Sequence, residues 1–171
     1  MNRKVVITGL LMAVVLTLDI ITKQWALNNL WDGSTRHLFG IVPLTLTYNT
    51  GVAFGLGVGE FRWLIVSGTV LVMVALTVLL RQANPADRVR VASIAAVMAG
   101  AAGNLIDRLK WDKGVVDFIG PLNLGFTNFP IFNAADMAIT CGACVLALSL
   151  WLEERAIEER KAPVETTTDP I

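Results

Sequence analysis

The sequence predicts a membrane protein: an all-α bundle of four transmembrane helices with a small β platform at one membrane surface. Three observations support this fold class. Of the 171 residues, 54% are hydrophobic and only 16% are charged, against about 25% charged in soluble domains. Four apolar segments are each long enough to cross a bilayer. Short stretches with the pattern of β-strands lie in the longer connections between them.

The first apolar segment, residues 5–25, follows Arg3 and Lys4 and resembles the start of a secretory signal peptide. We interpret it as a retained span. It has the length of a spanning helix, no Ala-x-Ala-like cleavage site ends it, and it carries Asp19 and Lys23 near its far end. These two residues lie four apart and share one helix face. We expect Lys23 to extend its ammonium to water and Asp19 to point into the bundle.

The other three spans are predicted over residues 63–80, 89–106 and 131–151. The third is rich in small residues, which let helices approach closely, so it is expected to be the central packing helix. Its small or polar positions recur at four-residue steps: Ala92, Ala96, Gly100 and Asn104. Residues 1–152 are expected to form one domain, and residues 153–171 a charged tail that is helical at first and then disordered.

Basic residues in the flanks and loops predict the orientation of the bundle. Eight of them fall on one side and five on the other, so the rule of positive cytoplasmic loops puts both termini in the cytoplasm. The first group is Arg3, Lys4, Arg81, Arg88, Arg90, Arg155, Arg160 and Lys161; the second is Arg36, Arg62, Arg108, Lys110 and Lys113.

Strands are predicted in the two outer connections. Residues 44–48 alternate with period two, and residues 55–59 form a Gly-rich mobile segment after them. The second connection contains a strand at 115–119, a turn at 121–123 and a possible strand at 124–127. Because unsatisfied sheet edges cannot face hydrocarbon, this platform is expected on the outer membrane surface.

Two acids, Asp117 and Asp136, stand among apolar neighbours at the outer end of the bundle. Two carboxyls brought close in a poorly solvated place cannot both ionise, so the pair holds an acid and a base at neutral pH, as aspartic hydrolysis requires. The structural alternative is that Asp136 caps a helix while Asp117 lies in a turn. Helix lengths favour a site, because seven polar residues reach the same level: Asp19, Lys23, Asn104, Asp107, Arg108, Asp117 and Asp136.

Other chemistries fit the sequence less well. The one histidine, His37, is expected to be an ordinary loop residue, so the ligands of a metalloprotease are missing. A Ser67–Lys23 pair is conceivable but weak, and Cys141 and Cys144 are interpreted as small packing residues. The net charge is zero and no basic stripe is present, which argues against nucleic acid as a partner.

Five motifs together resemble the lipoprotein signal peptidases, also called signal peptidase II, over residues 5–152. They are Asp19-x-x-x-Lys23, Asn49-Thr-Gly-x-Ala-Phe54, Gly103-Asn-Leu-Ile-Asp-Arg108, Gly114-Val-Val-Asp-Phe118 and Phe132-Asn-Ala-Ala-Asp136. Each motif alone is weak, but five in this order are specific.

The resemblance implies an aspartic endopeptidase of the bacterial cytoplasmic membrane that needs no metal or cofactor. It would cleave prolipoproteins on the amino side of a diacylglyceryl-modified cysteine, and the cyclic peptide globomycin would inhibit it. Asp117 and Asp136 would be catalytic. The matching residues that line or support the site would be Asp19, Lys23, Asn49, Gly51, Asn104, Arg108, Asn133 and Ala135. The alternative is a small transporter or channel whose outer-facing acids bind a cation.

Overall fold

The computed structural model describes residues 3–30, 33–51 and 58–161. Four long helices in this part of the chain have the length and apolar composition needed to cross a membrane. They are α1 (Arg3–Asn29), α2 (Val58–Gln82), α3 (Arg88–Lys110) and α4 (Ala134–Lys161). The four predicted apolar helices are thereby confirmed. The last helix begins three residues later than expected, because Asn133 caps its start, and it continues into the charged segment after residue 152.

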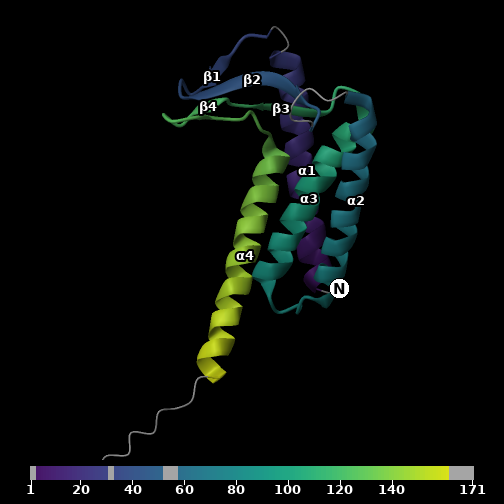
Figure 1. Cartoon of the computed structure of the whole chain (residues 1–171), viewed down its shortest axis with the longest axis vertical. Coiled ribbons are helices and arrows are strands. Elements are labelled where there is room, and N and C mark those ends of the chain that lie inside the picture. Colours follow the sequence, from purple (N-terminus) through teal and green to yellow (C-terminus); the bar gives the residue numbers. More distant parts are fainter. Residues whose placement is uncertain (1–2, 31–32, 52–57, 162–171) are drawn as a thin grey trace, which may run out of the picture.

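The third helix occupies the centre of the bundle, as its small residues predicted. The other three helices all pack against α3 (Figure 1). A methyl group added at Gly100 would meet the Ala135 carbonyl oxygen and come within 2.8 Å of the Ile139 side chain. On α4, a methyl group at Gly142 would lie 2.9 Å from the Ser93 carbonyl oxygen. Glycines on both helices therefore allow α3 and α4 to approach closely.

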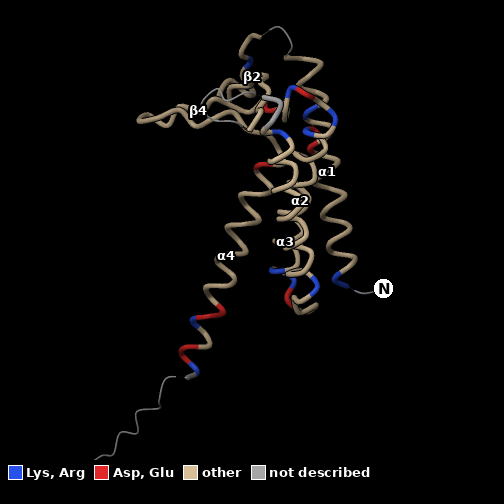
Figure 2. The backbone as a smooth tube through the Cα atoms, turned by 45° about the vertical axis from the view of Figure 1, so that its right-hand side comes forward, with Lys and Arg blue, Asp and Glu red and all other residues tan. Residues whose placement is uncertain are grey.

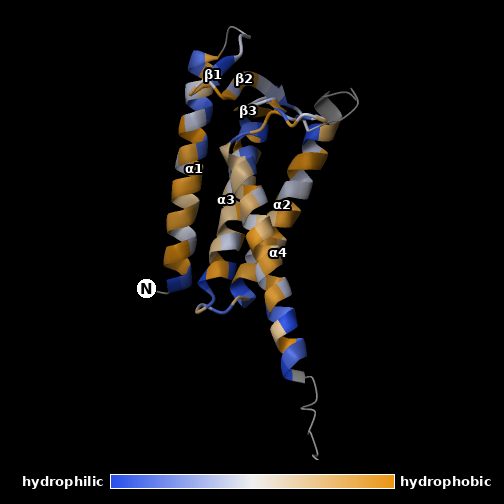
Figure 3. Ribbon diagram, turned by 90° about the vertical axis from the view of Figure 1, so that its left-hand side faces the viewer, coloured by the Kyte–Doolittle hydropathy of each residue, from blue (hydrophilic) through white to orange (hydrophobic). Residues whose placement is uncertain are grey.

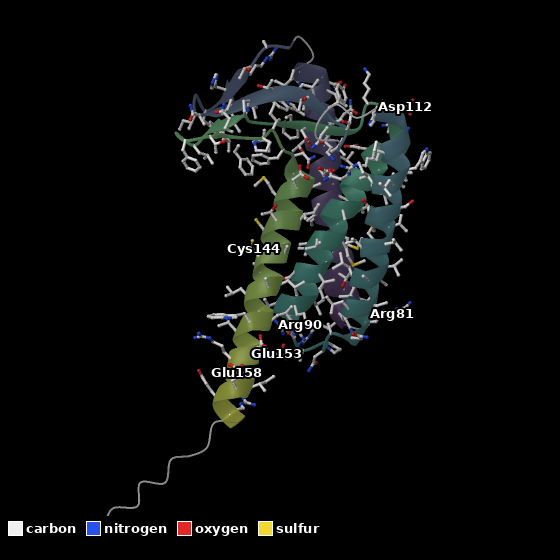
Figure 4. The ribbon with its side chains drawn as sticks, viewed as in Figure 1. Arg81, Arg90, Asp112, Cys144, Glu153 and Glu158 are labelled. Atoms are coloured by element: carbon white, nitrogen blue, oxygen red, sulfur yellow. The ribbon has the colours of Figure 1, made fainter. Side chains whose placement is uncertain are left out.

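Charged residues gather towards the two ends of the bundle, and the middle of each helix is almost free of them (Figure 2). The N-terminus and the end of α4 lie at the end opposite the sheet (Figure 1). There the Lys4 ammonium donates to the Leu80 and Ala83 carbonyl oxygens at 2.9 and 2.8 Å. Arg90 and Glu153 form an ion pair that joins α3 to α4 (Figure 4). The charged segment is thus helical at first, as expected, and residues 162–171 lie outside the described chain.

A three-stranded antiparallel sheet in the order β1-β2-β3 lies across the other end of the bundle (Figures 1 and 3). Its strands are β1 (Arg36–Leu38), β2 (Val42–Asn49) and β3 (Val115–Ile119). The strands predicted at 44–48 and 115–119 are confirmed. His37 lies in β1 and pairs with Pro43, so its assignment to a loop was wrong. The sheet rests on the end of α1 through a cluster of Ala26, Leu30, Leu44 and Phe118.

The second connection differs from the prediction. A small two-stranded sheet is formed by β4 (Leu122–Asn123) and β5 (Asn128–Phe129). The strand expected at 124–127 is instead the turn between them, closed by a 2.9 Å bond from the Leu124 amide to the Thr127 carbonyl. The Asn123 side chain accepts from the Gly125 amide at 2.7 Å, and Gly125 has a φ of 87°. This local bonding and left-handed backbone favour a turn over an extended strand.

The two cysteines also differ from their predicted role. Both thiols are free and exposed on α4, and Cys144 points away from the bundle (Figure 4). The buried residue on this part of the helix is Gly142, which packs against α3. The interpretation of Cys141 and Cys144 as packing residues was therefore wrong, since the small residue that makes the contact is the glycine between them.

Candidate active site

Asp117 lies at the centre of β3 and is 1% exposed. It sits opposite Thr47 of β2, and its neighbours Val116 and Phe118 are also buried. The structural alternative, in which Asp117 lies in a turn, is therefore wrong. A buried strand instead fixes the position of the backbone that carries the Asp117 carboxyl.

Asp136 lies in the first turn of α4, where it joins a reciprocal cap with Asn133. The Asn133 side-chain oxygen accepts from the Asp136 amide at 2.9 Å, and the Asp136 carboxylate accepts from the Asn133 amide at 3.2 Å. This arrangement resembles a capping box, with asparagine at the cap and aspartate three residues later. The capping role considered for Asp136 is therefore real. It also fixes the orientation of the Asp136 carboxyl.

One buried amide connects the two acids. The Asn133 Nδ2 group donates to Asp117 Oδ1 at 2.6 Å, while its Oδ1 atom accepts from the Asp136 amide. Asn133 has no exposed surface. The residue that begins α4 thus holds the strand acid as well as the helix acid.

Asn104 of α3 provides a second connection. Its Nδ2 group donates to Asp136 Oδ1 at 2.7 Å. Its Oδ1 atom accepts from Asn133 Nδ2 and from Lys23 Nζ, both at 3.1 Å. Asn104 therefore joins the acid pair to the charged residues of α1.

Lys23 is buried, with 4% of its surface exposed. Its ammonium lies 2.8 Å from carboxylate oxygens of both Asp19 and Asp107. The expectation that Lys23 reaches water was wrong, because these acids and Asn104 hold it inside the bundle. Ser67, by contrast, is exposed on α2, so the geometry does not favour a Ser–Lys pair.

Asp19 is 1% exposed, and its two carboxylate oxygens have different partners. One pairs with Lys23, and the other accepts from the Ala135 amide at 3.1 Å. A methyl group at Gly103 would come within 2.5 Å of Asp19, so a glycine provides the space this carboxylate occupies. Asp19 points into the bundle as predicted, where it contacts the start of α4.

The environment of Asp117 favours its protonated form. Burial raises the pKa of the Asp117 carboxyl from 3.8 to about 6. Hydrogen bonding from Asn49 and Asn133 opposes this rise, and the negative charge of Asp136 adds to it. A pair in which one carboxyl holds its proton more tightly can present an acid and a base together.

A groove of about 440 Å³ between α2, α3 and α4 reaches Asp136. Arg108, Asn104 and Asp136 line its polar part. The Arg108 Nε atom is buried, with no hydrogen-bond partner in the described part of the chain. The remaining lining is Ile65, Gly68, Thr69, Val72, Val97, Ala101 and Ile139. The groove therefore combines a mostly apolar wall with a few polar groups around Asp136.

The Asn49 motif is described only as far as Gly51. The Asn49 side chain accepts from the Gly51 amide at 2.9 Å. Gly51 has a φ of 75°, and a methyl group there would meet Ile65 at 2.7 Å and Arg108 at 3.5 Å. This bend brings the end of β2 beside Arg108. Residues 52–57, which include the rest of the motif and most of the predicted mobile segment, lie outside the described residues.

The structure brings together every residue predicted for the site, from the helices α1, α3 and α4 and from the sheet with the residues that adjoin it. Two contacts escaped the sequence analysis. Asp107 was assigned to the same level but given no role, and its carboxylate accepts from the Val116 amide at 3.2 Å. The Ala135 amide binds Asp19 through the backbone. Backbone donors leave no signal in residue type, so neither contact was predictable from the motifs.

Comparisons with known proteins agree with the resemblance. The family model described as signal peptidase (SPase) II matches residues 11–152. A lipoprotein signal peptidase of Hydrogenovibrio crunogenus is 34% identical over 95% of this chain and 94% of its own length. Another, of Syntrophomonas wolfei, is 38% identical over 87% of this chain and 95% of its own. A solved structure described as a bacterial membrane enzyme has a TM-score of 0.76 and 27% identity, covering 84% of this chain and 91% of that one.

Proposed function

The chain belongs to the signal peptidase II family, and on that premise we propose that it is a membrane peptidase that removes signal peptides from prolipoproteins. Cleavage occurs on the amino side of a diacylglyceryl-modified cysteine, in the bacterial cytoplasmic membrane. The observation that carries the proposal is the pair of acids, Asp117 and Asp136, joined by the buried amide of Asn133.

In the proposed mechanism, Asp117 and Asp136 share one proton. The ionised carboxyl takes a proton from water, and the resulting hydroxide attacks the carbonyl carbon of the scissile peptide bond. The protonated carboxyl polarises that carbonyl and then supplies a proton to the leaving amine. The two acids titrate as a pair, so each step is assigned to the pair. No metal or cofactor takes part.

The neighbouring polar groups suggest how substrate is held. Asn133 and Asn104 orient the acids through bonds of 2.6 and 2.7 Å. The Arg108 guanidinium lines the groove, and its Nε atom has no hydrogen-bond partner among the described residues, so Arg108 is suited to bind a carbonyl oxygen of the substrate backbone. Asp19 and Lys23 support the start of α4 and the Asn104 side chain.

The groove between α2, α3 and α4 suits the acyl chains of the lipid-modified cysteine. Its volume is about 440 Å³ and most of its lining is apolar. Chains seated there lie beside Asp136 and set the cysteine near the acids. Binding energy from these chains would select lipidated substrate and position its peptide bond. Globomycin, a known inhibitor of this family, would compete for the same acids and groove.

We further propose that both termini are cytoplasmic and that the sheet rests on the outer membrane surface. The excess of basic residues at the end away from the sheet supports this orientation. The two hairpin tips carry strongly exposed aromatic residues, Phe39 at 90% and Phe126 at 87%. Residues 33–50 and 118–132 contain no Asp or Glu. Apolar tips without acids suit the boundary between headgroups and acyl chains.

The test is cleavage of a diacylglyceryl-modified prolipoprotein by the pure protein in chelator-treated detergent. We expect a product whose new amino terminus is the modified cysteine, and inhibition by globomycin. The same protein in vesicles tests the alternative, a transporter or channel that binds cations at the acids. Cation flux without cleavage would reject the peptidase.

A further inference from the structure

Asp107 is a buried carboxylate that the mechanism above does not use. Its Oδ2 atom lies 2.8 Å from the Lys23 ammonium and 3.2 Å from the Val116 amide nitrogen, which donates to it. Asp107 is 8% exposed, and Val116 has no exposed surface. One carboxylate oxygen therefore joins α1 and α3 to the strand that carries Asp117.

The contact occurs on the edge of β3 away from β2, where no strand of the described residues pairs with it. On the edge away from β2, the amides of Phe118 and Ile119 both donate to the Phe132 carbonyl. Val116 is instead held by side chains: Asp107 accepts from its amide, and Asn133 Nδ2 lies 3.3 Å from its carbonyl oxygen. Buried backbone groups need such partners. Asp107 and Asn133 thus take the place of a strand next to Asp117.

We propose that Asp107, held by the Lys23 ammonium, is a positioning residue that anchors β3 through the Val116 amide and so sets where the Asp117 carboxyl meets Asn133. Val116 precedes Asp117 directly, so a shift of this amide moves the acid. The bond at stake is the 2.6 Å contact between Asn133 and Asp117. This inference rests on the proposed function for its kinetic consequences.

The short connection between α3 and β3 makes the anchor effective. It passes through Gly114, whose φ is 96° and where an added methyl group would overlap the Asn49 carbonyl. Cation–π contacts accompany it at Lys110, 4.4 Å from the Trp111 ring, and at Lys113, 5.2 Å from the Tyr48 ring. The end of α3 therefore fixes the start of β3, and Asp107 is the buried polar contact between them.

The experiment compares Asp107→Asn with Asp107→Leu. The Asn side-chain oxygen can replace Oδ2 as an acceptor for Val116 without the charge, whereas Leu has a similar size and no acceptor. We expect Asp107→Asn to keep kcat within about threefold of wild type. Asp107→Leu should lower kcat more than about tenfold and leave KM nearly unchanged, because interactions made only in the transition state are lost. Asp112→Asn is the matched control, an exposed acid near the same helix end that pairs with Arg62.

A second readout does not depend on cleavage: the titration of the Asp117 carboxyl by carbon-13 NMR. The charged groups that act on Asp117 are Asp136 of α4, Lys23 of α1 and Arg108 of α3. We expect the Asp117 pKa to fall towards its ordinary value in Asp107→Leu, because a displaced carboxyl is better hydrated, and to change little in Asp107→Asn. This readout remains available if wild type fails to cleave, an outcome that rejects the proposed function alone.

Three outcomes overturn the inference. One is a folded Asp107→Leu protein with the wild-type kcat and Asp117 titration. Another is an Asp107→Asn protein as impaired as Asp107→Leu, which would assign the effect to charge. If Asp107→Leu does not fold, Asp107→Ser is used in its place, because the serine hydroxyl is too short to reach the Val116 amide. The third overturning outcome is then an Asp107→Ser protein with the wild-type kcat and Asp117 titration.

Discussion

The Asn133 side chain donates a 2.6 Å hydrogen bond to Asp117, so the residue that begins α4 also orients the acid of β3. This bond fixes the start of α4 relative to β3. The same asparagine accepts from the Asp136 amide. Stability of the helix cap and geometry of the acid pair depend on different atoms of one side chain, and substitutions can separate them.

Replacing Asn133 with Ser is expected to keep the cap and lose the bridge. A serine hydroxyl can accept from the first-turn amides of α4, but it is too short to donate to Asp117. Melting should stay close to wild type while kcat falls by about tenfold or more. Asn133→Ala removes both functions and should also destabilise the protein by about 0.5–2 kcal/mol. Thermal unfolding and cleavage rates of the two variants check this; an Asn133→Ser protein with wild-type activity would contradict it.

Asp117→Asn and Asp136→Asn are each expected to abolish cleavage with little change in melting. The amide keeps the shape of the acid but cannot exchange the proton, and general acid–base catalysis is worth about 10²–10⁴-fold. The Asp136 variant keeps an oxygen that can accept from the Asn133 amide, so its cap should survive. Cleavage of lipidated substrate is measured by mass spectrometry. A variant with more than a small percentage of activity would remove that residue from the pair.

Stability should fall as pH rises through the pKa of Asp117. The folded pKa is about 6, against 3.8 for the free side chain, so the folded state binds the proton more tightly. The stabilisation is complete below pH 3.8 and is lost as pH passes 6. The difference of about two pKa units corresponds to up to about 3 kcal/mol. Unfolding measured between pH 3.5 and 7.5 should show this loss in wild type and less of it in Asp117→Asn. An identical slope in both proteins would refute the assignment.

Lys23→Met is expected to destabilise the protein more than Asp19→Ala. Without Lys23, Asp19 and Asp107 remain buried with no shared cation, and breaking a buried ion pair costs about 3–5 kcal/mol. Without Asp19, Lys23 still pairs with Asp107. Folded Asp19→Ala protein should nevertheless turn over slowly, because the Ala135 amide at the start of α4 loses its acceptor. Melting and cleavage are measured for both; a stable, fully active Asp19→Ala protein would show that Asp19 belongs to the scaffold.

Spin labels at the hairpin tips can test the proposed position of the sheet. Cys141→Ala with Cys144→Ala should retain full activity, since neither thiol has a proposed role, and provides the background for Phe39→Cys and Phe126→Cys. In lipid nanodiscs, both labels should be more accessible to oxygen than to a water-soluble nickel complex. A label at Asp112→Cys, an exposed site at the end of α3, is the control and should show the reverse. Tip labels as water-accessible as the control would reject membrane contact.

Much of this arrangement was predictable because hydrophobic length and residue spacing determine it directly. The spans follow from apolar runs, and the central position of α3 follows from Gly100 and its neighbours. The state of Lys23 was not predictable, because its exposure depends on Asp107 and Asn104, which are distant in sequence. The strand expected at 124–127 failed for a local reason, the Asx bond from Asn123 to Gly125. Contacts through backbone amides, such as Val116 with Asp107, required the fold itself.

Gly100 lies one helical turn before Asn104, against the Ala135 carbonyl on α4. Its lack of a side chain sets the clearance between the two helices, and therefore the reach of the Asn104 amide to Asp136. A side chain at Gly100 would push α3 and α4 apart and so separate Asn104 from Asp136 without contacting either residue. Mutational sensitivity in this protein consequently extends away from the acids along the α3–α4 seam, into a region with few polar atoms. Inactivating substitutions are therefore expected there too, at small apolar residues that have no polar group and no part in the chemistry.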